Sequence, residues 1–272
     1  MSALFSVPMA AYSLFRYNPR MDYSRAIRPR FSLYVLDLDG TLVDSLEDLW
    51  LSVNWILGRK GFPAVDRETV RRAVGNGARN LLARCFARAA DVAAPADHAG
   101  AIDAPDKNIP AVGAQTVPAG AALDAILDEY RAHYDAHCAE HTALYPGMRE
   151  WLEDLSAAGA RLAVLTNKPE TATRTLLDAL GVAPLFSVIA GPETYGTLKP
   201  DPAGLRAIMS ALGARAEETV MVGDSAVDVE TARNAGVAAV ALSGGLGDEE
   251  SLRAALDAYK AAGGDTLLVE RP

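Results

Sequence analysis

Cysteine is scarce in this chain, and long apolar runs are missing. The two cysteines, Cys85 and Cys138, form no C-x-x-C pair among 272 residues. Such a pattern excludes a disulfide framework and predicts a reducing, cytoplasmic location. No stretch approaches the roughly 20 apolar residues of a membrane-spanning helix, so we expect no membrane partner.

Positive charge is also in deficit. Lys and Arg number 26 against 35 Asp and Glu, a formal net charge of −9, which argues against nucleic acid as a partner. Hydrophobic residues make up 50% of the chain, enough to bury one sizeable core and a smaller module. We expect a monomer or a homodimer that binds a small molecule.

Two carboxylates, Asp37 and Asp39, directly follow the apolar run 31–36. In an extended strand, side chains i and i+2 share a face, so both carboxylates are expected to point beyond the carboxyl end of a buried strand, where α/β sheets bind ligands. At a separation of about 4 Å their repulsion is roughly 4 kcal/mol, which favours a divalent cation or a proton between them. Gly40 allows a tight exit from the strand and exposes backbone N–H groups to an anion.

Other interpretations of this segment explain less. Asp39-Gly40 is a common hairpin signal, but a hairpin accounts for nothing downstream. A calcium loop is excluded because its glycine comes two positions later and its last ligand is a glutamate, where Asp48 stands.

Polar residues recur after later apolar strands. Thr166-Asn167 follow the run 161–165, Lys199 precedes Pro200 and Pro202 at a helix start, and Gly223-Asp224-Ser225 follow the run 219–222, with Asp228 three residues on. Taken singly, each has a structural explanation: Thr166 or Asp224 could cap a helix, and Lys199 could be solvated. Their joint occurrence in this order predicts a shared site.

This ordered set resembles the haloacid-dehalogenase-type phosphohydrolase superfamily over residues 31 to about 245. The resemblance implies that Asp37 is the nucleophile and Asp39 the general acid and base. It implies a Mg²⁺ ion held by Asp37, the backbone carbonyl of Asp39, and Asp224, with Asp228 supporting that site from nearby. The phosphoryl-binding residues that it implies are Gly40, Thr41, Thr166, Asn167 and Lys199.

Alternating helices and strands predict an α/β fold with a doubly wound parallel, Rossmann-like sheet. Helices are expected at 170–180, 203–212, 226–235 and 248–262, and strands at 185–190, 219–222, 237–241 and, at an edge, 266–269. The resemblance adds an inserted all-helical cap. The expected organisation is a poorly ordered extension at 1–30, a core of 31–47 and 143–272, and a cap of 48–142 with a flexible insertion near 90–120.

Within the expected cap, Gly75, Asn76 and Gly77 break a helical region that spans 67–90. The triplet is similar to the cap loop of phosphoglycolate phosphatases, which implies close approach to a small substrate; an ordinary helix–helix turn is the alternative. It is not a dinucleotide loop, because Asn80 occupies the place of the third glycine and no strand precedes it.

Two further features have competing explanations. His133, His137 and His141 recur every four residues on an expected helix, where zinc ligation competes with a solvated helix face. Residues 1–30 are rich in arginine and poor in acid, as in a transit peptide, but an overhang or an overextended start with Met21 as the initiator explains them equally.

The function that these observations predict is a magnesium-dependent phosphomonoester hydrolase of carbohydrate metabolism that converts 2-phosphoglycolate to glycolate and phosphate. Because the position of Asp39 holds an acid that can protonate a leaving oxygen, P–O cleavage is favoured over carbon–halogen cleavage. The alternatives are a phosphomutase or a sugar-phosphate or nucleotide phosphatase of the same fold, and, outside enzymes, a scaffold module that binds a phosphorylated ligand.

Overall fold

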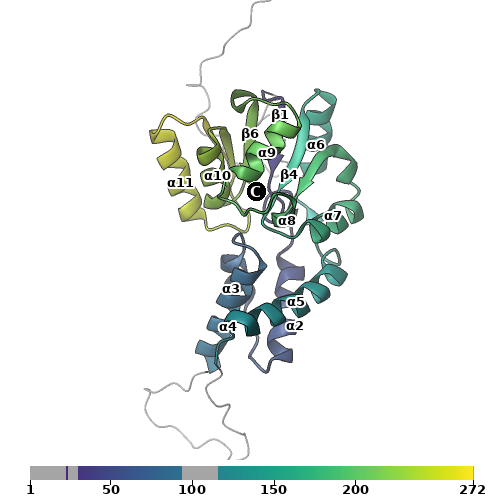
Figure 1. Ribbon diagram of the computed structural model, residues 1–272, viewed down its shortest axis with the longest axis vertical. Helices are drawn as coiled ribbons and strands as arrows, with labels where there is room; N and C mark the ends of the chain where they lie inside the picture. The colour runs from purple at the N-terminus through teal and green to yellow at the C-terminus, as the bar shows by residue number, and fades with distance from the viewer. Residues whose placement is uncertain (1–22, 24–29, 94–115, 272) are drawn as a thin grey trace, which may run out of the picture.

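The computed structural model describes residue 23 and residues 30–93 and 116–271 (Figure 1). The predicted extension at 1–30 and the predicted insertion near 90–120 fall mostly outside the described residues.

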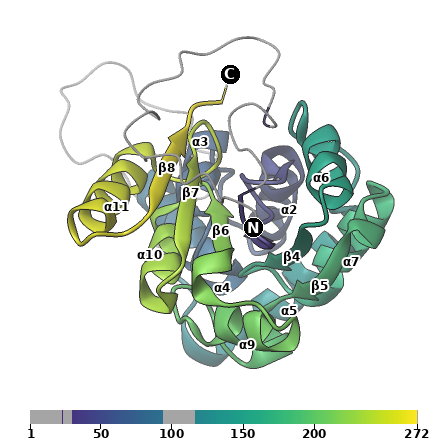
Figure 2. The ribbon, with the colours of Figure 1, turned by 90° about the horizontal axis from the view of Figure 1, so that it is seen from above.

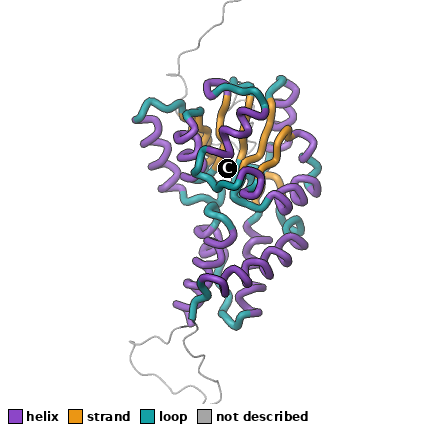
Figure 3. The backbone as a smooth tube through the Cα atoms, viewed as in Figure 1, coloured by secondary structure: helices purple, strands orange, loops and turns teal. Residues whose placement is uncertain are grey.

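A parallel sheet of six strands forms the centre of the upper body, in the order β5-β4-β1-β6-β7-β8 (Figures 1 and 3). Its strands are β1 (Leu33–Leu36), β4 (Arg161–Leu165), β5 (Phe186–Ala190), β6 (Thr219–Gly223), β7 (Ala238–Leu242) and β8 (Thr266–Val269). The central strand β1 pairs in parallel with β4 and β6, so that Leu36 lies opposite both Val164 and Val222. The doubly wound α/β fold predicted from the sequence is confirmed, with 266–269 at the sheet edge.

Helices cover both faces of this sheet (Figure 2). They are α6 (Met148–Ala157), α7 (Glu170–Ala179), α8 (Pro192–Tyr195), α9 (Ala203–Ala211), α10 (Ala226–Ala235) and α11 (Glu249–Ala261), with 3₁₀ turns at Ala183–Leu185 and Ala216–Glu218. Trp151 of α6 and Leu176 of α7 pack in one apolar cluster, whereas Leu205 of α9 and Leu252 of α11 pack in the cluster of the other face. Apolar strand residues enter both clusters, which is why the strands are hydrophobic throughout.

Within the described residues, four helices and no strand form a separate lower body (Figures 1 and 3). They are α2 (Leu46–Arg59), α3 (Arg67–Ala73), α4 (Ala78–Ala93) and α5 (Gly120–His137). Buried side chains such as Ile56, Leu82, Phe86 and Leu127 give this body its own apolar core. It is the inserted helical region that the resemblance implies, and the break between α3 and α4 falls at the glycine triplet.

A two-stranded ribbon joins the two bodies. Strand β2 (Val43–Asp44) pairs antiparallel with β3 (Ala143–Leu144), so the chain enters and leaves the helical body side by side. The sequence did not predict this ribbon, because two residues per strand are too few for an alternating pattern.

Two local features are not apparent from the sequence. Ser45 stands directly before α2, but its side chain makes no capping bond to the helix and its hydroxyl donates to Asp39. His141 lies beyond the end of α5 at His137, so the three histidines do not share one helix. None of the helices in the described part of the chain combines the length and apolarity needed to cross a bilayer.

Candidate active site

The turn after β1 brings two distant segments together. The N–H of Asp37 still donates to Val222 of β6, after which the N–H groups of Leu42 and Val43 fold back onto the carbonyl of Leu38. Gly40 has φ +82°, and a Cβ there would lie 2.1 Å from Oδ2 of Asp224. Only glycine permits this approach, so the turn and Asp224 fit together through the missing side chain.

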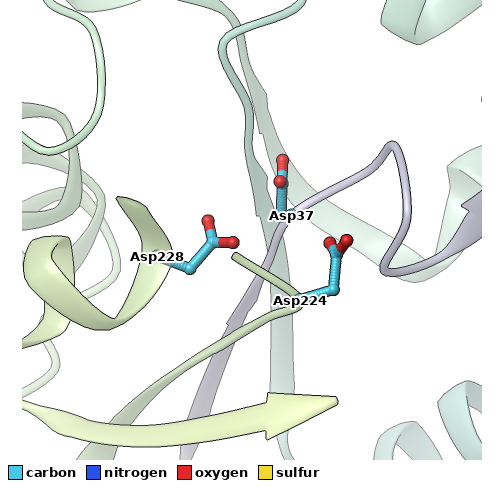
Figure 4. A group of neighbouring side chains, drawn as sticks. All are labelled: Asp37, Asp224 and Asp228. Atoms are coloured by element: carbon cyan, nitrogen blue, oxygen red, sulfur yellow. The ribbon is translucent and has the colours of Figure 1, made fainter. Parts of the chain in front are cut away.

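Three buried carboxylates meet at the carboxyl ends of β1 and β6. Asp37, Asp224 and Asp228 each offer an oxygen, and these oxygens lie within 4.8 Å of one another (Figure 4). The Lys199 ammonium lies 2.6 Å from Oδ1 of Asp228 and 2.8 Å from Oδ1 of Asp37. The structure therefore brings Lys199 together with Asp37, which follows β1, and with Asp224 and Asp228, which follow β6.

Burial governs the charge of this group. It raises the pKa of Asp37 to about 7, against the lowering effect of Lys199 and with a further rise from Asp228 and Asp224. Burial likewise raises the pKa of Asp224, Asp228 adds to that rise, and the hydrogen bond from Thr41 opposes it. Burial lowers the pKa of Lys199, but the carboxylates of Asp228 and Asp37 outweigh it, so the pKa lies above its usual value and the ammonium stays charged.

The carboxylate group fits a hard divalent cation. Its three donors are oxygens, and a single lysine contacts only two of the three acids. Buried carboxylates that are not balanced by positive charge are costly unless they are protonated or hold a metal. The buried aspartates could therefore hold a metal ion. Burial and the neighbouring acids, which make a cation favourable here, are also what raise the pKa values of Asp37 and Asp224.

Asp224 is fixed by three donors. Thr41 Oγ1 donates to its Oδ1 at 2.6 Å, while the N–H groups of Leu246 and Gly247 donate to its Oδ2 at 2.8 and 2.9 Å. The N–H of Gly40 donates to Val43 and that of Thr41 to Leu38. The donors of Gly40 and Thr41, two predicted phosphoryl-binding residues, are therefore engaged within the turn and on Asp224.

Arg271 supports the same turn from the far end of the chain. Its buried guanidinium donates to the carbonyl oxygens of Gly40 and Thr41 at 2.5 and 2.6 Å and lies over the ring of Tyr145. The sequence did not point to Arg271, because it lies more than 200 positions from Gly40 and Thr41 and outside every motif.

The side chain of Asp39 lies apart from the three-carboxylate group. Its Oδ1 accepts hydrogen bonds from Ser45 Oγ at 2.7 Å and from Lys168 Nζ at 2.8 Å. The Lys168 ammonium also lies 2.5 Å from the hydroxyl of Tyr134 on α5. Lys168 was missed in the sequence, although a cation directly after Thr166-Asn167 at a strand tip was a usable signal.

Asn167 ties the lysine segment to the helical body. Its Oδ1 accepts from the N–H of Lys199 at 2.8 Å, and its Nδ2 donates to the carbonyls of Lys199 and Gly75. Its neighbour Thr166 is buried, and its hydroxyl oxygen accepts from the N–H of Lys168. Asn167 thus positions the backbone of Lys199. The Thr166 hydroxyl accepts one hydrogen bond and can still donate its hydrogen to a ligand.

A cavity of about 60 Å³ lies between the two bodies. Asp37, Asp39, Thr166, Asn167 and Lys168 line it from the sheet, and Gly75, Gly77, Tyr130 and Tyr134 are among the residues that line it from the helices. Asn76, the middle residue of the predicted cap loop, is not among the lining residues; its carbonyl accepts from Asn80. The cavity therefore combines both predicted acids with two of the three predicted cap residues.

The ring nitrogens of His133, His137 and His141 contact three different groups and do not converge on one point. Nδ1 of His133 contacts Ser52, Nδ1 of His137 contacts the carbonyl of His133, and Nδ1 of His141 lies 2.7 Å from Asp48. The rings of His133 and His137 stack, and His133 also stacks on Trp55.

Comparison with known proteins agrees with this geometry. Residues 34–242 match the family model of the haloacid dehalogenase-like hydrolases. The chain is 40% identical to a phosphoglycolate phosphatase of Pseudomonas syringae pv. syringae over 78% of its length and 70% of that protein, and 39% identical to one of Rhodospirillum rubrum over 79% and 80%. The crystal structure of a predicted phosphoglycolate phosphatase from Haemophilus somnus superposes with a TM-score of 0.69 at 31% identity, covering 80% of this chain and 87% of that one. The chain belongs to the haloacid dehalogenase-like hydrolase family.

Proposed function

We propose that this protein is a magnesium-dependent phosphatase that hydrolyses 2-phosphoglycolate to glycolate and phosphate. The observation that carries the proposal is the buried group of Asp37, Asp224 and Asp228 with Lys199, of which Asp37 lines a cavity between the sheet and the helical body. The substrate is supported by the names of relatives at about 40% identity.

The chemistry is assigned to the two acids of the first turn. A carboxylate oxygen of Asp37 attacks phosphorus, and the glycolate oxygen leaves with a proton from Asp39, which yields an aspartyl phosphate. Asp39 then takes a proton from a water molecule, and the oxygen of that water attacks the phosphorus of the aspartyl phosphate. The bond between phosphorus and Asp37 breaks, which releases phosphate and restores the Asp37 carboxylate. The contacts of Asp39 with Ser45 and Lys168 hold its side chain at the cavity wall for both steps.

The remaining residues bind and orient. Lys199 balances charge between Asp37 and the phosphoryl oxygens, and the Thr166 hydroxyl donates to one of those oxygens. Asp37, the backbone carbonyl of Asp39 and Asp224 would hold Mg²⁺, with Asp228 fixing Lys199 beside them. When bound, the ion supplies positive charge to the phosphoryl group and to Asp37.

Phosphate release from a panel of esters tests the proposal. With Mg²⁺ present we expect 2-phosphoglycolate to be turned over faster than hexose phosphates or nucleotides, and EDTA to remove the activity. Asp37→Asn removes the nucleophile and is expected to abolish release while the protein stays folded, whereas Asp257→Asn on the exposed face of α11 serves as the matched control. Faster release from hexose phosphates would refute the substrate, and interconversion of sugar phosphates without release would indicate a phosphomutase.

A further inference from the structure

The cavity wall contributed by α5 carries a polar group without a partner. Tyr130 is only 2% exposed and lines the cavity, and its hydroxyl has no hydrogen-bond partner within the described residues. Leaving a buried hydroxyl unsatisfied is unfavourable, so such a group in a cavity points to a ligand atom. Burial raises the pKa of Tyr130 well above its usual value, so the hydroxyl remains protonated and acts as a donor.

The surroundings of this hydroxyl favour an anion. The ring of Tyr130 stacks on that of Tyr134, with centroids 5.8 Å apart and planes at 11°, and the Tyr134 hydroxyl contacts the Lys168 ammonium. Lys168 and Arg131 also line the cavity. The ammonium also contacts the carboxylate of Asp39, and Asp135, an exposed acid, lines the cavity as well. Tyr130 therefore supplies the donor on this wall that no acid among the described residues accepts from.

The positions of the cavity walls decide which end of a substrate reaches Tyr130. Asp37 and Asp39 lie on the sheet side of the cavity, and Tyr130 lies on the helical side. A substrate whose phosphoryl group contacts Asp37 therefore presents its opposite end to α5.

We propose that the Tyr130 hydroxyl, together with the Lys168 ammonium that contacts the stacked Tyr134, binds the carboxylate of a short phosphorylated hydroxy acid and thereby selects that substrate class. The inference rests on the proposed function and assigns the residue that reads the non-phosphoryl end of the ester. A neutral hydroxyl that donates to a carboxylate discriminates strongly, because an uncharged substrate end leaves the donor unpaired.

Substrate pairs that differ in the carboxylate test this assignment. Tyr130→Phe removes only the hydroxyl, and we expect kcat/KM for 2-phosphoglycolate to fall by about 10- to 100-fold, chiefly through KM. The rate with ethyl phosphate, which has a methyl group in place of the carboxylate, is expected to stay unchanged. Tyr195→Phe on α8, outside the cavity lining, is the matched control and should leave both substrates unaffected.

A binding measurement separates this inference from the proposed function. In calorimetric titrations with Mg²⁺, Tyr130→Phe should weaken phosphonoacetate but not ethylphosphonate, and neither titration requires turnover. If Tyr130→Phe weakens binding or turnover equally for the carboxylate compound and its methyl counterpart, or for neither, the carboxylate subsite is overturned. A wild-type protein that releases no phosphate from any ester overturns the proposed function instead, and the titrations then still decide the subsite.

Discussion

Lys168 donates a hydrogen bond to Asp39, with Nζ 2.8 Å from Oδ1, and the same ammonium contacts Tyr134 of α5. Asp39 therefore receives its position from β4, through the residue that follows Thr166-Asn167, and from a helix of the other body. One buried cation thus links the acid, the sheet and the cap.

Replacing Lys168 by Met should slow catalysis more than it weakens substrate binding to the phosphoryl site. Among the described residues, Asp39 would keep Ser45 as its one side-chain donor. Loss of a charged hydrogen bond of about 1.5–3 kcal/mol predicts a fall in kcat of about 10- to 100-fold. Steady-state kinetics with ethyl phosphate measure the effect apart from the carboxylate subsite.

Two variants make the Lys168 result interpretable. Lys168→Arg keeps a cation and should recover part of kcat, whereas Lys260→Met at an exposed position of α11 should change nothing. An unchanged kcat in Lys168→Met together with a lowered melting temperature would show that the residue only joins the two bodies.

Gly40→Ala should disable the site by steric conflict. The added Cβ would stand 2.1 Å from Oδ2 of Asp224 and 2.7 Å from the backbone nitrogen of Leu246, so the turn or the carboxylate must move. We expect loss of phosphatase activity and weaker Mg²⁺ binding by calorimetry. Gly236→Ala is the control, because φ is +77° there but nothing lies within 4 Å of its Cβ, so only the backbone strain of about 1–2 kcal/mol applies. Equal melting temperatures and activities in the two variants would contradict the steric explanation.

Asp48 should stabilise the junction of the two bodies in a pH-dependent way. Its buried carboxylate accepts hydrogen bonds from the N–H groups of His141 and Thr142 and from the Thr142 hydroxyl. Burial alone would raise the pKa of Asp48, but these hydrogen bonds outweigh it and lower the pKa below its usual value. Because the folded-state pKa lies below the unfolded value of about 3.9, the stabilisation is complete above that pH and is lost as pH falls through the folded-state pKa.

Urea denaturation of Asp48→Asn measures this contribution. We expect the free energy of unfolding to fall by about 2–4 kcal/mol at pH 7, and the difference from wild type to shrink below about pH 4. Asp128→Asn on α5, whose side chain is 80% exposed, should leave stability unchanged at both pH values. A difference that stays constant down to pH 3 would assign the effect to packing rather than to charge.

The sequence predicted the elements that follow strong patterns. The expected helices and strands of residues 170–269 agree with α7, α9, α10, α11, β5, β6, β7 and β8 to within one residue at each end. Because parallel strands place their carboxyl ends at one edge, Asp37, Asp224 and Lys199 could be expected to meet before any coordinates were known.

The contacts that the sequence did not predict depend on side-chain direction across the fold. Lys168 could equally have been solvated, and only the position of α5 brings Tyr134 to it. Arg271 follows β8, the edge strand of the sheet, and its side chain reaches the turn at Gly40. Ser45 stands directly before α2, yet it makes no capping bond and its hydroxyl donates to the nearby Asp39 carboxylate.

The position of β1 at the centre of the sheet has a consequence for how the chain is made. Leu36 is synthesised early, but its partners Val164 and Val222 follow only after the whole helical body. Helices α2 to α5 pack mostly on one another through contacts that are closer in sequence, and such contacts form fastest. During translation the helical body is therefore complete while the strand that precedes Asp37 still lacks both neighbours. The apolar residues of β1 are exposed to aggregation until β6 leaves the ribosome.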